Sequence, residues 1–173
     1  MDVSFRSVAL NKRYPLRISR GEFSGSVNLF ASVRSGDLDG LGEAAPGSLI
    51  GTDTAESFQA ELTSFLEDCP EALDNPHEGW QLARSAKVSS CAWAAVDIAL
   101  WDLLAKHARL PLYRLLGLPR RSVPTSVTVG ILPPEVVHER VPEILDRIGA
   151  CYLKVKLGSP EGLDADQSMY AAV

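Results

Sequence analysis

Residues 152–158 constrain the fold of this chain more than any other stretch. Apolar and polar residues alternate there with the period of a β-strand. Lys154 and Lys156 share one face of this strand with a tyrosine, and the apolar residues take the other face. A β-branched segment at residues 123–130 and a helical segment at residues 133–148 precede it. Strand, helix and strand in this order predict the start of a parallel α/β unit.

The two lysines on one strand face have two interpretations. On a solvated edge strand they would only discourage aggregation. In a parallel barrel the apolar face would pack on helices, and the lysine face would point inward, towards the C-terminal mouth where active sites lie. A neighbouring like charge and partial desolvation both lower a lysine pKa, and a neutral amine can take a proton from carbon. The second interpretation indicates proton abstraction next to a carboxylate or an amide.

The N-terminal part of the chain has a different pattern. Strands are expected at residues 3–10, 26–34 and 41–46, which together suggest an antiparallel meander. Residues 14–25 are polar and contain a proline and two glycines, so we expect a flexible loop. Helices are expected at residues 53–68, within 71–85, at 87–107 and at 112–116. Asp53, with Glu56 three residues later, predicts a capping box at the first of these helices.

After the strand at residues 152–158, residues 161–173 predict one more helix. A (β/α)8 barrel needs roughly 250 residues, and only residues 122–173 follow the predicted connection between two units. We therefore expect two domains, at residues 1–121 and 122–173. The second is expected to be incomplete and the chain to be a fragment.

Composition excludes several classes of protein. The net charge of −5 argues against a nucleic-acid-binding protein. The three cysteines form neither a metal-ligand spacing nor a disulfide framework, so a cytoplasmic protein is expected. No apolar run approaches the roughly 20 residues that span a bilayer, and the first residues lack the pattern of a signal peptide.

Several motifs, taken in order along the chain, resemble those of the enolase superfamily. Residues 94–106 and 110–117 resemble the mandelate racemase and muconate-lactonizing enzyme branch. Residues 42–46 are similar to a motif near the end of that branch's N-terminal meander, and the lysine strand to its Lys-x-Lys motif. Within the branch, residues 125–131 resemble the L-Ala-D/L-Glu dipeptide epimerases most.

This resemblance implies a fold and a set of site residues. The implied fold class is an α+β capping domain, with a three-stranded antiparallel meander plus helices, followed by the first strands and helices of a truncated (β/α)8-type barrel. Lys156 is implied to be one of two acid/base lysines flanking the substrate α-carbon. Lys154 would contact the substrate carboxylate, and Thr128 would also contact substrate. Arg20 lies in the segment that is similar to the family's mobile lid.

The resemblance also implies parts that this chain does not carry. The family binds Mg²⁺ through three carboxylates on later barrel strands, and its second acid/base lysine is on the sixth strand. Asp164 and Asp166 come too early to be those ligands. Without the metal charge a lysine could not stabilise the enediolate intermediate, so the 173-residue chain alone is expected to be inactive. The full-length form is expected to be a homo-oligomer that binds a small-molecule dipeptide or other carboxylate.

Two alternatives stay open at this point. A muconate cycloisomerase or an o-succinylbenzoate synthase of the same branch would share the lysine pair. The motif that would discriminate them from an epimerase, a later barrel strand that contacts the dipeptide's amino group, is missing from the sequence. A non-catalytic, truncated capping-domain protein is the alternative of another class.

Overall fold

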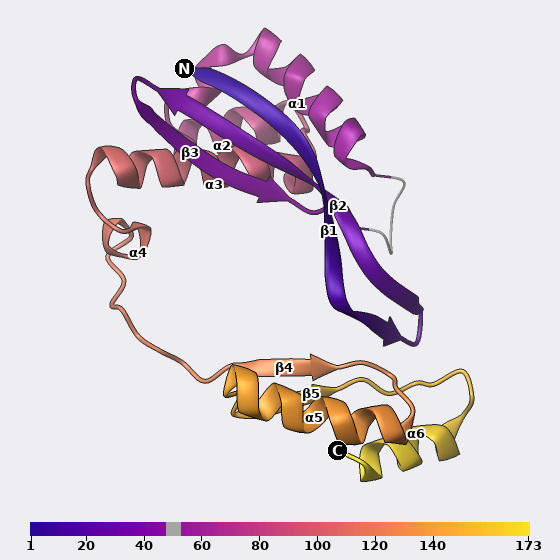
Figure 1. Ribbon diagram of the computed structural model, residues 1–173. Coiled ribbons are helices and arrows are strands. Elements are labelled where there is room, and N and C mark those ends of the chain that lie inside the picture. Colours follow the sequence, from indigo (N-terminus) through magenta and orange to yellow (C-terminus); the bar gives the residue numbers. More distant parts are fainter. Residues whose placement is uncertain (48–52) are drawn as a thin grey trace. The chain divides into compact units, whose positions relative to one another are not determined.

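The computed structural model describes residues 1–47 and 53–173 (Figure 1). They form two compact units. Unit 1 comprises residues 1–10 and 26–120, and unit 2 comprises residues 11–25 and 121–173. Residues 11–25, the tip of the first hairpin, therefore group with residues 121–173. The predicted boundary after residue 121 places them in the N-terminal domain instead.

The first sheet is a three-stranded antiparallel meander in the order β1-β2-β3, as predicted. Its strands are β1 (Asp2–Ile18), β2 (Gly21–Ser35) and β3 (Leu38–Ala44). The expected flexible loop at residues 14–25 is wrong, because both strands continue through it and only residues 19–20 form the turn. The prediction of a loop rested partly on Pro15, because proline is typical of turns and loops. Pro15 lies in β1, an edge strand of the sheet, where a residue without a backbone N–H is tolerated.

Helices cover one face of this sheet (Figure 1). They are α1 (Ala55–Asp68), the 3-10 helix η1 (Pro70–Leu73), α2 (Pro76–Ser85) and α3 (Ser90–His107). The short helix α4 (Leu112–Leu115) follows α3. The predicted capping box is displaced by one residue. Thr54 caps α1, with its hydroxyl accepting from Ser57 N at 3.1 Å and its own N–H donating to Ser57 Oγ at 2.9 Å. Helix α3 begins later than predicted, because Lys87 has a φ of 61° and Ser89 is its N-cap.

The core of unit 1 depends on a close approach between β3 and α3. A Cβ added to Gly42 would lie 2.0 Å from the carbonyl oxygen of Ala95, and one added to Gly40 would lie 2.0 Å from that of Ala99. Both alanines are fully buried. The strand and the helix thus meet backbone to backbone, and only glycine fits at these two strand positions.

An ion pair connects the same two elements at the surface. Lys106 Nζ donates to Asp102 Oδ2 at 2.7 Å, which is the i, i+4 pair that the sequence predicts. The same carboxylate oxygen accepts from the backbone N–H of Leu41 at 2.9 Å, and Lys106 also donates to the carbonyl of Asp39 at 2.7 Å. These contacts fix α3 along β3.

Unit 2 begins a second, parallel sheet. It contains β4 (Ser126–Val129), α5 (Pro134–Ile148), β5 (Tyr152–Val155) and α6 (Leu163–Ala171). The predicted order of strand, helix, strand and helix is confirmed, and β4 and β5 pair in parallel. Both strands are shorter than predicted, and β5 ends one residue before Lys156. Gly158, with a φ of 96°, turns the chain away from the strand direction.

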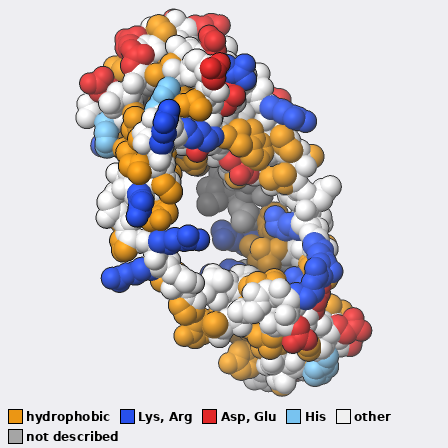
Figure 2. All heavy atoms as spheres, turned by 60° about the vertical axis from the view of Figure 1, so that its left-hand side comes forward, with side chains coloured by type: hydrophobic (Ala, Val, Ile, Leu, Met, Phe, Trp, Pro, Cys, Tyr) orange, Lys and Arg blue, Asp and Glu red, His pale blue; other side chains and the backbone are white. Residues whose placement is uncertain are grey.

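The core of unit 2 lies between this sheet and its two helices. Val129, Val137, Ile144 and Met169 are buried in it. Hydrophobic side chains also reach the surface of both units (Figure 2). None of the helices in residues 1–47 and 53–173 is long and apolar enough to cross a membrane.

Candidate active site

The parallel strand pair places three of the predicted site residues on one face. The odd-numbered residues of β4 and β5 pack into the core of unit 2. Thr128 and Lys154, which are partners in the strand register, therefore lie on the opposite face. Lys156 follows on the same face, two residues after Lys154. The alternation in the sequence thus predicted the shared face of the two lysines.

Lys156 stays hydrogen-bonded to the sheet although β5 ends before it. Its backbone N–H donates to the carbonyl of Val129 at 3.0 Å. Its side chain is half-buried, whereas that of Lys154 is exposed. The described strands β4 and β5 form a two-stranded sheet and not a closed barrel. That the two lysines point into the interior of a barrel therefore stays a prediction.

The turn that carries Arg20 lies at the C-terminal ends of β4 and β5. The carbonyl of Arg17 accepts from the N–H of Ile131 at 2.8 Å, just after β4. A Cβ added to Gly158, beyond β5, would lie 3.1 Å from the Cβ of Ser19. Arg20 itself is exposed, and within residues 1–47 and 53–173 no hydrogen bond or ion pair joins it to the other predicted site residues.

An ion pair also holds the hairpin to the loop after β5. Arg17 Nη2 lies 2.7 Å from Glu161 Oε1. The Ser159 hydroxyl donates to the other oxygen of Glu161. The Ser159 hydrogen bond, followed by that from Arg17, lowers the pKa of Glu161 to about 2. Glu161 is therefore an anion across the physiological range and an acceptor for both groups.

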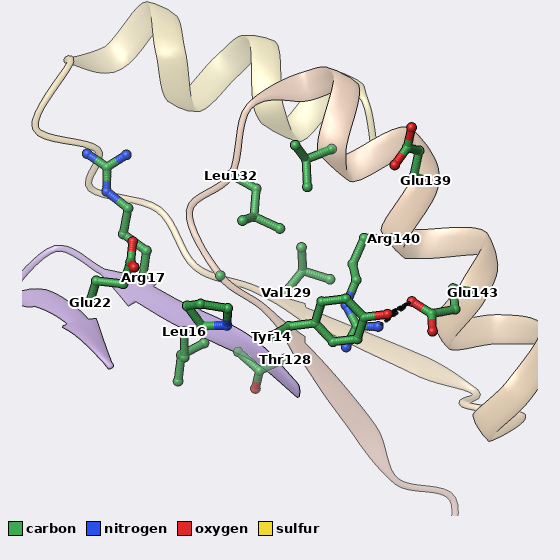
Figure 3. A pocket seen from close by; sticks show the side chains of 13 residues that line it. Tyr14, Leu16, Arg17, Glu22, Thr128, Val129, Leu132, Glu139, Arg140 and Glu143 are labelled. Atoms are coloured by element: carbon green, nitrogen blue, oxygen red, sulfur yellow. Dashed lines mark hydrogen bonds and ion pairs between the residues drawn. The ribbon is translucent and has the colours of Figure 1, made fainter. Parts of the chain in front are cut away.

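A cavity of about 350 Å³ opens between the hairpin tip, β4 and α5 (Figure 3). Thr128 contributes to its wall at β4, and Tyr14 and Arg17 contribute from the hairpin. Neither lysine lines this cavity, and Arg20 does not line it either. Thr128 is thus the partner of Lys154 in the strand register, and it also forms part of the wall of the cavity beside the hairpin.

Tyr14, Arg140 and Glu143 line one part of the cavity and belong to a cluster centred on Glu143, which we call the Glu143 clasp (Figure 3). It consists of Arg13, Tyr14, Arg140, Glu143 and Arg147. The Tyr14 hydroxyl donates to Glu143 at 2.5 Å, and the guanidinium of Arg140 lies 3.4 Å from the centre of the Tyr14 ring. The three arginines contact the carboxylate at 2.8–3.0 Å. The Tyr14 hydrogen bond, then the hydrogen bond from Arg140 and the charge of Arg13, lower the pKa of Glu143 to about 2.

Replacing Glu143 with glutamine is expected to loosen the hairpin tip. The folded-state pKa lies below the ordinary 4.5, so the stabilisation is fully present above pH 4.5 and is lost as the pH falls through about 2. Amide hydrogen exchange of residues 11–25 should be faster in the variant at pH 7. The difference from the unmodified protein should shrink as the pH is lowered towards 2.

Glu139→Gln is the matched control for this measurement. Glu139 is on the same helix, about one turn away, and lines the same cavity without joining the clasp. Equal exchange in the two variants at pH 7 would show that the clasp does not hold the hairpin.

Metal ligands are not assembled by the described residues. Within residues 1–47 and 53–173, no group of three or more His, Cys, Asp or Glu side chains could hold a metal ion. Asp166, which comes too early in the sequence to be one of the expected ligands, accepts backbone hydrogen bonds from Gly158 and Ser159 instead. The residues present therefore do not fit a Mg²⁺ site.

Comparison with known proteins finds a matching family model and several relatives that are described as dipeptide epimerases. A family model described as the mandelate racemase / muconate lactonizing enzyme N-terminal domain matches residues 1–117. A hydrophobic dipeptide epimerase from Roseobacter litoralis is 56% identical over 174 residues, covering 100% of this chain and 49% of that protein. Another, from Flavobacteria bacterium MS024-2A, is 47% identical over 173 residues, with coverage of 100% and 49%.

A solved structure has the same arrangement of elements. The crystal structure of a dipeptide epimerase from Enterococcus faecalis V583, complexed with Mg and the dipeptide L-Leu-L-Tyr, matches with a TM-score of 0.81 and 28% identity. The match covers 98% of this chain and 48% of that one. The chain thus spans about half the length of the curated relatives and of the solved structure that it matches.

Proposed function

Because the chain belongs to the mandelate racemase / muconate lactonizing enzyme family, we propose that it supplies the N-terminal half of a dipeptide epimerase. The observation that carries the proposal is the 56% identity, over the whole chain, to a hydrophobic dipeptide epimerase. The shared face of Thr128, Lys154 and Lys156 also supports the proposal. Proton abstraction uses a basic group such as the Lys156 amine, and the neighbouring Thr128 and Lys154 side chains can donate hydrogen bonds to a carboxylate substrate.

Each proposed residue has a role that its position permits. The Lys156 amine takes the proton from the substrate α-carbon, and the electron pair of the broken C–H bond moves into the carboxylate to give an enolate. The Lys154 ammonium pairs with that carboxylate, and the Thr128 hydroxyl donates a hydrogen bond to the substrate. Arg20, on the hairpin turn at the strand ends, contacts the substrate from outside the sheet. A second lysine beyond this chain returns a proton to the opposite face.

The proposed cofactor is Mg²⁺, and the Enterococcus faecalis relative was crystallised with it. When bound, Mg²⁺ supplies positive charge to stabilise the enolate. Since the described residues form no ligand group, its ligands would come from residues outside this chain. We propose that the chain alone is inactive for this reason. The homo-oligomer and the cytoplasmic location stay predictions.

Hydrophobic dipeptides are the proposed substrate class. Two relatives carry that description, and the solved relative holds L-Leu-L-Tyr. All three are described as epimerases, which favours epimerisation over the cycloisomerase and o-succinylbenzoate synthase alternatives. The truncated, non-catalytic alternative is tested by reading the nucleotide sequence beyond Val173, where a stop codon would favour it.

The test of the proposed function is proton exchange by the full-length protein in D₂O with Mg²⁺. We expect the α-proton signal of the second residue of L-Leu-L-Tyr to disappear from the proton NMR spectrum, and the epimer to accumulate. L-Ala-L-Glu should react more slowly. A full-length protein that exchanges no α-proton in either dipeptide, or in a wider dipeptide panel, would overturn the proposed substrate class.

A further inference from the structure

A buried carboxylate that the proposed reaction does not use lies just after the lysine strand. Asp166 is in the first turn of α6 and is only 8% exposed. Its Oδ2 accepts from the N–H of Gly158 at 2.8 Å, and its Oδ1 accepts from the N–H of Ser159 at 2.9 Å. Both oxygens are thus occupied by two consecutive backbone donors of the loop that follows β5.

These bonds hold the chain directly downstream of Lys156. Gly158, two residues later, has a φ of 96°, which an L side chain would adopt only with strain. Directly upstream, the N–H of Lys156 is bonded to the carbonyl of Val129 on β4. The backbone of Lys156 and Leu157 is therefore fixed at both ends, by the strand ladder on one side and by Asp166 on the other. Hydrogen bonds to a carboxylate are roughly twice as strong as neutral ones.

We propose that Asp166 is a positioning residue for Lys156, an inference that rests on the proposed function. By holding the turn at Gly158 and Ser159, Asp166 sets the direction in which the Lys156 side chain leaves the sheet. Proton transfer depends steeply on this geometry, because a displacement of about 1 Å can cost on the order of 10²-fold in rate. Asp166 contacts neither the substrate nor the reacting atoms.

The alternative is that Asp166 only stabilises the loop and the start of α6. The two roles differ in what they do to the two epimers of a substrate. In a reaction with two lysines, each lysine exchanges the α-proton of the epimer whose C–H bond faces it. A displaced Lys156 slows exchange for one epimer, whereas a loss of folded protein slows exchange for both by the same factor.

The experiment measures α-proton exchange in D₂O for each epimer of L-Leu-Tyr separately, with the full-length protein and its Asp166→Asn variant. Asparagine keeps one acceptor oxygen and replaces the other with a donor group. We expect the exchange of one epimer to fall about tenfold to a hundredfold relative to the other. That epimer should be the one whose exchange Lys156→Ala abolishes, and KM should change little.

Asp164→Asn is the matched control. Asp164 is exposed in the same first turn of α6, so the substitution removes the same charge from the same helix end. We expect it to leave the exchange ratio of the two epimers unchanged. If Asp166→Asn does not fold, Asp166→Glu keeps the carboxylate but displaces it, and should give the same asymmetry at a smaller size.

An equal decrease for both epimers in every folded Asp166 variant would overturn the positioning role and leave only a structural one. The proposed function would still stand in that case. Failure of the proposed function looks different, because the unmodified full-length protein would then exchange neither epimer.

Discussion

Replacing Gly42 with alanine is expected to destabilise unit 1 by about 3 kcal/mol, the upper end of what overpacking usually costs. The new Cβ would lie 2.0 Å from the carbonyl oxygen of Ala95 and 2.7 Å from the backbone N of Ala99. Both are main-chain atoms of α3, so no side-chain rotation can relieve the contact. The helix would have to move away from β3, and the fully buried alanines between them would lose their packing.

The measurement is urea unfolding of the full-length protein and the variant, followed by the far-UV circular dichroism signal. Gly47→Ala is the control, because a Cβ added to Gly47 would have no heavy atom within 4 Å among the described residues other than its chain neighbours. We expect the control to stay within about 0.5 kcal/mol of the unmodified protein. If Gly42→Ala gives no soluble protein while Gly47→Ala does, the prediction also holds; equal midpoints for the two variants would contradict it.

Local periodicity was enough to predict much of the fold. The i, i+3, i+4 repeat of small and apolar residues identified α3, and alternation identified β5 and the face of that strand on which Lys154 lies. The same signals failed at residues 14–25, where composition indicated a loop and the chain forms a hairpin tip. Tyr14, Leu16 and Ile18 do alternate with other residues there, but this period-2 signal is short, and the proline and two glycines of the segment favoured a loop.

Contacts around the candidate site have a local signal in the sequence only where their residues are close along the chain. Lys154 and Lys156 are two residues apart, and the spacing of Arg140, Glu143 and Arg147 along one helix already indicates ion pairs. The hydrogen bond from Tyr14 to Glu143 joins residues 129 positions apart, and no local sequence pattern predicts such a contact. Asp166 had a weaker signal, an acidic residue in the first turn after a strand and a glycine-containing loop, which is also typical of ordinary helix starts.

Replacing Lys156 with alanine is expected to lower the epimerisation rate of the full-length protein by on the order of 10³-fold, the central value for loss of a general acid or base. Folding should be little affected. The side chain is half-buried, and it lies on the sheet face opposite the core of unit 2. The backbone hydrogen bond to Val129 does not depend on the side chain. The measurement is kcat for L-Leu-L-Tyr, with thermal melting to verify the fold.

Lys156→Arg separates an acid/base role from a charge role. Arginine keeps the positive charge but does not lose its proton in proteins. If Lys156 transfers the α-proton, the arginine variant should be as inactive as the alanine variant, although both melt like the unmodified protein. If Lys156→Arg retains a tenth or more of the rate, the side chain acts through its charge. The acid/base assignment would then be wrong, and Lys154 would be the next residue to test in the same way.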